Sequence, residues 1–448
     1  MIVPHTRKAR IFSGISANLI GQILTATIQL IGIPIFLSKW GKEYYGEWLI
    51  LFTVPSYLGM SDLGLGTVST TEMAMCVSRG ETQRAAKIFR ASFWSIMMVG
   101  LSTCTLFVIT LWALPWHDWL HLRQLQPSET TIALVLLTVY IFEAIVLTLP
   151  LGIYRVAGRY GRGQMVSNLF RLAEFLAVLS VVAYGYGVVF AAAAMAIVRF
   201  FYVGFVWMEA HRLAPWLHLR PLRWEWPLIR PLAIPSLTMT TTYAGQSLVS
   251  QGLVTIIGVT MGASSVVVFS TIRTLCNFAR QIIGAINLSV FSEFSISIGN
   301  EDLSTARRLH TRTLQANFAL TFLAVAGLKL LGGWVLFHWT KGQVNAEEPF
   351  FTLYLSYLLL NSLWIGSWNM LLGCNRHKGL TRYFLMSSII MLVAVYHGIG
   401  YFGLSIVPVT LLITDVIFAF FVLKKSALVL QQPVGVFFSD MLATRKIR

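Results

Sequence analysis

Residues 13–37 read SGISANLIGQILTATIQLIGIPIFL, a run that contains no Asp, Glu, Lys or Arg. A helix needs about 20 apolar residues to cross about 30 Å of hydrocarbon, so this run predicts a membrane-spanning helix. Similar runs recur along the 448-residue chain, which is 56% hydrophobic and only 12% charged. We expect an all-α polytopic membrane protein with twelve transmembrane helices. The predicted spans are 13–37, 45–66, 91–114, 130–152, 164–183, 188–208, 232–258, 266–290, 313–336, 349–373, 380–398 and 404–423.

The distribution of Lys and Arg orients these helices. Short loops that are rich in basic residues stay in the cytoplasm. With both termini inside, 25 of the 34 basic residues fall in cytoplasmic segments and 4 in outer loops. The pattern predicts cytoplasmic termini, and it accounts for most of the net charge of +16 without a nucleic-acid partner.

The two halves of the chain correspond weakly in sequence. Trp40-Gly41 corresponds to Met261-Gly262, and residues 86–90 correspond to 306–310. Two matching halves predict two six-helix lobes with the substrate site between them. The assigned segments are an N-terminal lobe (1–208), a cytoplasmic interfacial linker rich in Arg and Trp (209–231), a C-terminal lobe (232–425) and a basic cytoplasmic tail (426–448).

Charged residues within the spans are the main functional candidates. An ionised side chain at a helix centre costs about 2.5–3.5 kcal/mol on the translocon scale. Arg273, Asn277 and Arg280 share one face of the span 266–290. A guanidinium binds phosphate oxygens bidentately and keeps its charge when buried, so this face predicts an anionic, phosphate-bearing substrate. Alternatively, each arginine caps backbone carbonyls or pairs with a carboxylate.

Arg199 and Glu174 lie at similar depths in neighbouring spans, which leaves an ion pair and a direct substrate role equally open. Arg171 could bind substrate or extend toward the membrane surface. Glu143 and Asp415 are mid-membrane carboxylates without a basic neighbour on their own helix. Together with Glu174 they are candidates for coupling to a proton or sodium gradient, and a structural, hydrogen-bonded acid is the alternative.

Polar residues of the first span have gating or structural interpretations. Asn18 and Gln22 could line the path or hydrogen-bond to another helix, and Pro34 is expected to bend its helix. His117 and His121 have a zinc-compatible spacing, but the tryptophans beside them favour a loop at the membrane interface. We expect no metal site and no cofactor. The nucleotide-binding and hydrolase motifs of soluble enzymes are absent, so we expect a protein that is not an enzyme.

The stretch WGKEYYGEW at residues 40–48, followed by SDLGLG at 61–66, resembles the start of the polysaccharide-biosynthesis flippases. These Wzx-type proteins belong to the multidrug/oligosaccharidyl-lipid/polysaccharide exporter superfamily. The resemblance implies a transporter that moves an undecaprenyl-pyrophosphate-linked oligosaccharide, an O-antigen or exopolysaccharide repeat unit, across the bacterial inner membrane by alternating access. It also implies membrane lipids and other polysaccharide assembly proteins as partners. Asp62 matches the family's loop signature, where a structural cap or gate hinge is expected.

Two alternatives stay open. Multidrug and toxin extrusion antiporters share the helix count but use carboxylates in their first helices, whereas the spans 13–37, 232–258 and 349–373 contain no Asp or Glu. The cations within the membrane would also repel a cationic drug. A membrane polymerase or ligase of envelope polysaccharide is the other alternative, but it would be expected to carry a larger outer loop.

Overall fold

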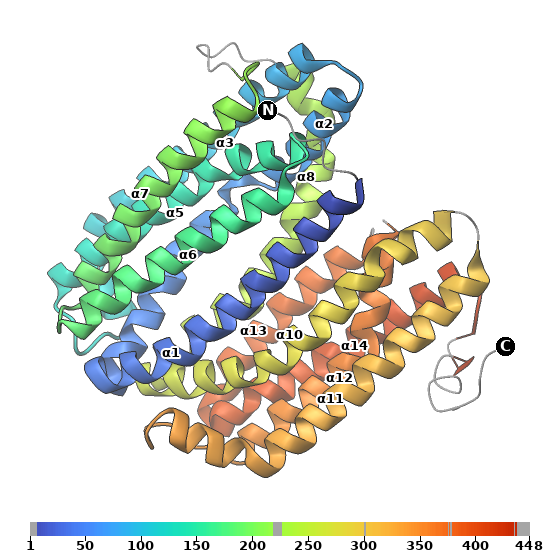
Figure 1. Ribbon diagram of the computed structural model, residues 1–448. Coiled ribbons are helices and arrows are strands. Elements are labelled where there is room, and N and C mark those ends of the chain that lie inside the picture. The colour runs from blue at the N-terminus through green and yellow to red at the C-terminus, as the bar shows by residue number, and fades with distance from the viewer. Residues whose placement is uncertain are drawn as a thin grey trace. The chain divides into compact units, whose positions relative to one another are not determined.

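The computed structural model describes residues 7–217, 226–299, 302–374, 376, 379–433 and 435–436. These residues form helices joined by short connections, with no strand among them (Figure 1). The α-helices are α1 (Arg7–Ser56), α2 (Leu65–Ser78), α3 (Thr82–Ala113), α4 (Trp116–Trp119), α5 (Pro127–Val156), α6 (Tyr160–Ala183), α7 (Val188–Leu213), α8 (Trp226–Ser247), α9 (Leu253–Met261), α10 (Ala263–Gly299), α11 (Leu303–Trp339), α12 (Phe350–Gly373), α13 (Leu380–Phe402) and α14 (Ile406–Leu430). Two 3-10 turns, η1 (Tyr57–Asp62) and η3 (Gly403–Ser405), and one π turn, η2 (Leu248–Gly252), connect them.

Nine helical segments within the described residues are long and apolar enough to cross a membrane. Two of them, Phe12–Ser78 and Leu380–Leu430, are 67 and 51 residues long and each contain two predicted spans. The predicted span 266–290 lies in α10, which is not among the nine. The protein is therefore a multi-pass membrane protein, while the count of twelve and the side of the termini stay predictions.

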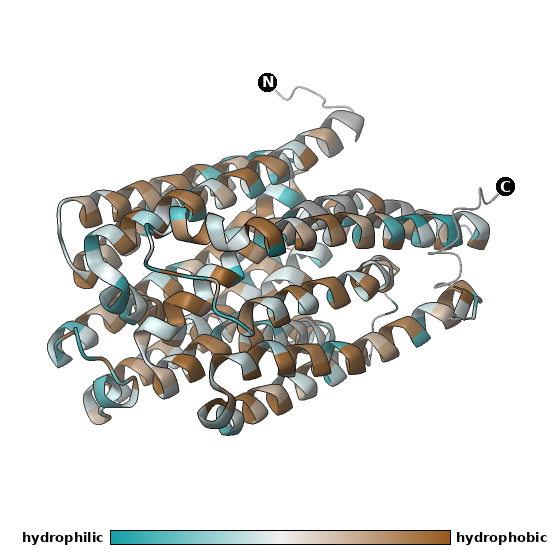
Figure 2. Cartoon of the chain, turned by 90° about the horizontal axis from the view of Figure 1, so that it is seen from below, coloured by the Kyte–Doolittle hydropathy of each residue, from teal (hydrophilic) through white to brown (hydrophobic). Residues whose placement is uncertain are grey.

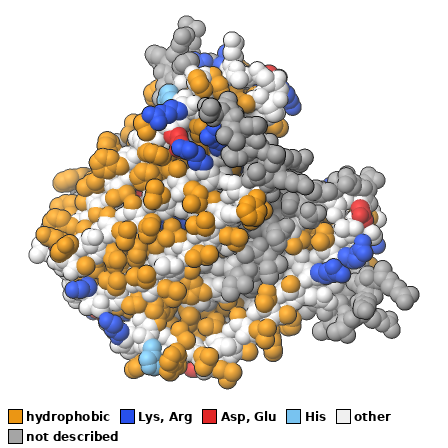
Figure 3. Space-filling view, in the orientation of Figure 1, with side chains coloured by type: hydrophobic (Ala, Val, Ile, Leu, Met, Phe, Trp, Pro, Cys, Tyr) orange, Lys and Arg blue, Asp and Glu red, His pale blue; other side chains and the backbone are white. Residues whose placement is uncertain are grey.

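Exposed hydrophobic side chains cover these helices. Trp112 on α3, Phe200 on α7 and Leu330 on α11 are 80%, 66% and 82% exposed. Figure 2 shows apolar residues along most helices, and the face in Figure 3 is dominated by hydrophobic side chains, with Lys and Arg mainly toward its margins. Hydrocarbon accommodates such a surface, and helices satisfy their backbone groups internally, as a lipid environment requires.

The chain divides into two compact units, Met1–Ser247 with Met261–Val266, and Leu248–Thr260 with Val267–Arg448. In the first unit α5 packs against α3 and α7, and α1 lies beside α6. Because α8 packs against α2 and α3, it belongs to this unit. In the second unit α12 packs against α11 and α14. The lobe boundaries at 208 and 232 stay predictions, and residues 218–225 of the linker and 437–448 of the tail lie outside the described residues.

The stretch 40–48 connects segments at one end of the first unit. Gly41 has φ 73° and breaks α1 where the sequence separates its first two spans, seven residues after Pro34. The Trp40 indole donates to the carbonyl of Tyr186 at 3.0 Å, and the Tyr44 hydroxyl accepts from the Val188 N–H at 3.1 Å. Both bonds hold the short connection between α6 and α7, which joins these helices as the sequence predicts.

Glu47 anchors a second connection at the same end. Its side chain is 1% exposed, and its carboxylate accepts the backbone N–H groups of Arg123, Gln124 and Leu125 at 2.6, 2.7 and 3.0 Å. These three donors lie in the loop that precedes α5, where no helix supplies them with acceptors. Part of the family-like stretch is therefore explained by loop anchoring.

The SDLGLG stretch interrupts the second predicted span. Residues 45–66 were expected to form one helix, but α1 ends at Ser56 and the left-handed residues Leu63 and Gly64, with φ 49° and 67°, separate η1 from α2. Asp62 Oδ1 accepts the N–H of Gly64 at 2.9 Å and stabilises this turn. Left-handed backbone is costly for a side chain such as Leu63 unless the surroundings hold it, so the break is a built feature.

Asp302 caps α11 and gives the fold a specific acid sensitivity. Its carboxylate accepts from the Thr305 N–H at 3.0 Å and the Ser304 hydroxyl at 2.8 Å. Hydrogen bonds from Thr305 and Ser304 lower the pKa of Asp302 to about 2, below the usual value of about 3.9. A lowered folded-state pKa stabilises the fold above about pH 4, and this contribution disappears as the pH falls toward 2. We expect Asp302→Asn to lack this part of the pH dependence in thermal unfolding scans in detergent, and parallel curves for variant and wild type would contradict the cap.

Candidate functional site

An ion pair joins α6 and α7 inside the first unit. Arg199 Nε lies 2.5 Å from Glu174 Oε1, and Arg199 Nη2 lies 2.9 Å from Glu174 Oε2. Tyr140 on α5 donates to the same carboxylate at 3.2 Å, and its ring centroid lies 4.2 Å from Arg199 Cζ. Arg199 also donates to the Tyr140 hydroxyl. The sequence leaves an ion pair and a substrate contact open, and the structure pairs the two residues bidentately.

Glu143 lies one helical turn from Tyr140 on α5. It interacts electrostatically with Arg199 and Glu174. Its Oε2 atom is buried and has no hydrogen-bond partner among the described residues. A buried oxygen without a partner is unfavourable unless it takes up a proton, a cation or a donor from a ligand. Glu143 is consequently a buried carboxylate with capacity for a further partner.

The other predicted residues of the first unit connect α6 with α1. Arg171 on α6 donates to the Thr25 hydroxyl on α1 at 2.9 Å, and its side chain is exposed. Asn18 accepts from the Gln164 amide at 2.6 Å. Gln22 is half-buried on the same helix as Asn18. Interhelical hydrogen bonding, one of the two interpretations of Asn18, is what the structure displays.

Two arginines of α10 lie in the second unit. Arg273 donates to the carbonyl of Ser250 at 2.8 Å, and its Cζ lies 4.9 Å from the Phe269 ring centroid. Ser250 belongs to the π turn η2. Asn277 is half-buried between the two arginines along the helix.

Arg280 has a different environment. Its Cζ lies 5.9 Å from the Tyr357 ring centroid, and its side chain is exposed although it stands in the interior of α10. A cation at that position would be costly against lipid, so it is compatible with a water-accessible or ligand-accessible surface. Among the described residues, no carboxylate forms an ion pair with Arg273 or Arg280.

Asp415 on α14 is the carboxylate that interacts electrostatically with Arg280. It is 8% exposed, and its Oδ2 accepts from Asn361 at 2.9 Å and from the Trp364 indole at 3.1 Å. Asp415 thus has two donors in place, unlike the open oxygen of Glu143.

Sequence reasoning missed one polar face of α12. Tyr354, Tyr357, Asn361 and Trp364 recur at i, i+3, i+7 and i+10, so they share one side of the helix. On this side, Tyr357 lies beside Arg280, and Asn361 and Trp364 donate to Asp415. The helical spacing of these residues is present in the sequence, but uncharged side chains within an apolar span do not indicate a polar face.

The outer histidines engage their own loop. His117 Nε2 lies 2.8 Å from the Leu125 carbonyl, and His121 Nδ1 lies 3.1 Å from the Trp119 carbonyl. Across the part of the chain that the structure describes, no group of three or more His, Cys, Asp or Glu residues is arranged to hold a metal ion.

Solved structures, but no curated protein sequences, are similar to this chain. No protein-family model matches the chain. No curated protein matches it in sequence. Among solved structures, an inward-facing multidrug resistance MATE family transporter of the MOP superfamily is similar with a TM-score of 0.70 and 13% identity, over 91% of this chain and 96% of that one.

Two further structures show the same likeness. An outward-facing multidrug resistance MATE family transporter has a TM-score of 0.63 and 15% identity, over 96% of this chain and 97% of that one. A MOP superfamily transporter from Pyrococcus furiosus, described by a reverse polarity of its binding pocket that suggests a different function, has a TM-score of 0.63 and 15% identity, over 95% and 97%. The chain therefore has the fold of the MOP superfamily transporters.

Proposed function

We propose that this protein is an alternating-access transporter that carries an anionic, pyrophosphate-linked lipid saccharide from the inner to the outer leaflet of a bacterial inner membrane. The observation that carries the proposal is the state of Arg273 and Arg280. Both belong to α10, and neither forms an ion pair with a carboxylate among the described residues. Similarity to both an inward-facing and an outward-facing MOP transporter supports the alternating mechanism.

The charge argument distinguishes the two units. In the first unit Glu174 neutralises Arg199, so this cation is already occupied. In the second unit Arg280 is exposed and lies beside the Tyr357 ring; Asp415 interacts with it electrostatically, but the two form no ion pair in the described part of the chain. Guanidinium groups remain charged at any physiological pH and match phosphate oxygens in a bidentate geometry. In this proposal a pyrophosphate binds Arg280 directly, and Arg273 exchanges its hydrogen bond to the Ser250 carbonyl for one to the pyrophosphate.

Energy for transport could come from a proton or sodium gradient through a carboxylate. Glu143 is our first candidate for this role because its Oε2 has no hydrogen-bond partner in the described chain. Asp415 is the second candidate, since Asn361 and Trp364 already bond to it.

Multidrug extrusion is the second candidate function, and the fold comparisons by themselves favour it. The similar structures with inward-facing and outward-facing conformations are multidrug resistance MATE transporters. A cationic drug, however, would meet Arg273 and Arg280 in the second unit. The Pyrococcus furiosus protein, with its reversed pocket polarity, supports the idea that this fold also serves substrates of other charge.

Transport in proteoliposomes tests the two functions together. A lipid-pyrophosphate-linked oligosaccharide is followed by the access of an added lectin to its glycan, and ethidium uptake is measured in parallel. We expect the double variant Arg273→Gln/Arg280→Gln to slow saccharide translocation by about tenfold or more, because hydrogen bonds to charged groups contribute about 1.5–3 kcal/mol each.

The matched control is Arg312→Gln, which removes an exposed arginine of α11. It is expected to transport at the wild-type rate. Wild-type transport by the double variant at normal abundance would exclude the arginines as anion ligands. Ethidium transport without saccharide transport would replace the flippase with the extrusion function.

A further inference from the structure

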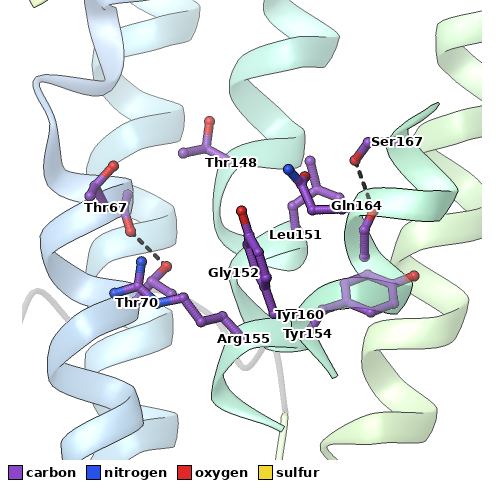
Figure 4. Close-up of a pocket in the computed structure, with 12 residues that line it drawn as sticks. Thr67, Thr70, Thr148, Leu151, Gly152, Tyr154, Arg155, Tyr160, Gln164 and Ser167 are labelled. Atoms are coloured by element: carbon purple, nitrogen blue, oxygen red, sulfur yellow. Dashed lines mark hydrogen bonds between the residues drawn. The ribbon is translucent and has the colours of Figure 1, made fainter. Parts of the chain in front are cut away.

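A cavity of about 200 Å³ lies in the first unit, where the end of α5 meets the start of α6 beside α2 (Figure 4). The described residues around it contribute hydroxyl, amide, phenol and guanidinium groups but no carboxylate. Neither Arg199 nor Glu174 is among the residues that line it. The polar side chains used below are Thr70, Thr148, Arg155, Tyr160, Gln164 and Ser167.

Close helix packing holds the hydroxyl groups of this cavity in place. A Cβ atom at Gly152 would lie 2.2 Å from Thr70 Oγ1, and one at Gly66 would lie 2.1 Å from Thr148 Cγ2. Glycine at these positions lets α2 and α5 approach until each threonine packs on the backbone opposite. The side chains of Thr70 and Thr148 are therefore positioned by contacts with the opposite backbone.

Two threonine hydroxyls of the cavity have hydrogen-bond acceptor capacity left. Thr70 and Thr148 each donate to the backbone carbonyl four residues earlier, at 2.7 and 3.3 Å, while the Ser167 hydroxyl lies 2.9 Å from the Gly163 carbonyl and 2.7 Å from the Tyr202 hydroxyl. A hydroxyl has one donor and two acceptor lone pairs, so its remaining capacity is to accept. A ligand here must supply donors.

Other groups at the cavity are hydrogen-bond donors. Arg155 uses one nitrogen for the Thr71 hydroxyl at 2.5 Å, and a guanidinium carries five N–H donors. Gln164 donates once to Asn18 at 2.6 Å, which leaves one N–H and the amide oxygen. Tyr160 adds an aromatic ring that is 42% exposed. A ligand must therefore accept as well as donate, and it can place an apolar face on the ring.

These requirements select one class of small ligand. Phosphate mainly accepts hydrogen bonds, whereas the Thr70 and Thr148 hydroxyls have already donated theirs to backbone carbonyls. An organic cation would meet Arg155 without a carboxylate to balance it. A sugar ring both donates and accepts, and it carries an apolar face. Drug-sized ligands occupy pockets of about 300–1,000 Å³, so this smaller cavity suits a single ring.

We propose that this cavity binds one sugar ring of the transported saccharide, with Arg155 and Gln164 as donors and the hydroxyls of Thr70 and Thr148 as acceptors. The inference rests on the proposed function for the identity of its substrate. The basic residues Arg155, Arg159 and Arg162 assign this end of the unit to the cytoplasm by the charge rule, which is the side where a lipid-linked saccharide is made available.

The test compares two lipids in proteoliposomes, one that carries an oligosaccharide on its pyrophosphate and one that carries none. Thr70→Val and Gln164→Leu keep the side-chain volume nearly constant while removing polar contacts. We expect each to lower the ratio of the two transport rates by about tenfold. Thr131→Val is the matched control, because Thr131 is a half-buried threonine elsewhere on α5 whose hydroxyl donates to the Pro127 carbonyl of its own helix. A variant that merely misfolds would lower both rates together and leave the ratio unchanged.

The outcomes separate the cavity from the overall function. If wild type transports, and both variants keep the wild-type ratio while they move the saccharide-free lipid at the wild-type rate, the sugar subsite is wrong while the proposed function stands. If wild type moves neither lipid, the proposed function fails, and thermal stabilisation by free glucose and N-acetylglucosamine then decides the subsite. Saturable stabilisation that is lost in Thr70→Val supports it. Stabilisation by inorganic phosphate alone, or by none of these probes, overturns it.

Discussion

Replacing Arg199 with methionine is expected to lower the free energy of unfolding by about 3–5 kcal/mol, because the substitution leaves the Glu174 carboxylate buried without its cation. The side chains of Arg199 and Glu174 are 16% and 11% exposed. Only the Tyr140 hydroxyl would still donate to the carboxylate. The loss is measurable by equilibrium unfolding in mixed detergent micelles.

A second substitution isolates the uncompensated charge as the cause. Arg199→Met/Glu174→Gln removes both charges and keeps a group that can bond to Tyr140, so it should recover more than half of the lost stability. Arg171→Met is the matched control, because Arg171 is exposed on the neighbouring helix α6 and donates to the Thr25 hydroxyl of α1. A cost of less than about 1 kcal/mol is expected there. A double variant as unstable as Arg199→Met would show that lost packing, not charge, is responsible.

Replacing Glu47 with alanine is expected to cost about 3 kcal/mol or more in the free energy of unfolding. The backbone N–H groups of residues 123–125 would lose the Glu47 carboxylate as their hydrogen-bond acceptor. Each buried donor left without a partner costs about 1–3 kcal/mol, although water reaches part of this loop and reduces the sum. Thermal unfolding of the purified variant, together with faster proteolysis of the loop before α5, measures the effect.

The variant Glu47→Gln tests the same prediction with a smaller expected effect. Glu47→Gln keeps one oxygen, which can still accept from Arg123 and Gln124, but it turns an NH₂ group toward the Leu125 N–H. Its cost should lie between those of wild type and alanine. Glu43→Gln is the matched control, since Glu43 is exposed and accepts from the Ser264 hydroxyl. Equal stability of Glu47→Ala and Glu43→Gln would show that the loop does not depend on Glu47.

The helices were predictable because lipid imposes a simple rule on sequence. Most predicted spans coincide with one helix; the exceptions are the second span, which is interrupted before residue 66, and the span 232–258, which the π turn η2 divides between α8 and α9. The four residues left between the spans 164–183 and 188–208 do form the tight connection between α6 and α7. The miss at 57–66 has a local cause. Ser61 to Gly66 contain two glycines and an aspartate that accepts from its own backbone, and this turn chemistry outweighs an otherwise apolar pattern.

The candidate site was only partly predictable, because charge marks a residue as unusual but does not identify its partner. Arg199 and Arg280 looked alike in the sequence as membrane arginines. In the structure one is bound to Glu174, and the other has Tyr357 beside it. The uncharged residues Tyr140 and Trp364 gave no signal of their own, yet they complete the polar contacts of Glu174 and Asp415.

The sequence by itself determined that this is a helical membrane protein and which charges lie within its apolar segments, because hydrophobicity and helix length act locally along the chain. Only the tertiary structure decided which charges are neutralised, which loop Glu47 anchors and where Thr70, Arg155 and Gln164 surround a cavity. These properties depend on distances between residues 25 to 94 positions apart, and helix packing sets such distances through contacts that no local pattern contains.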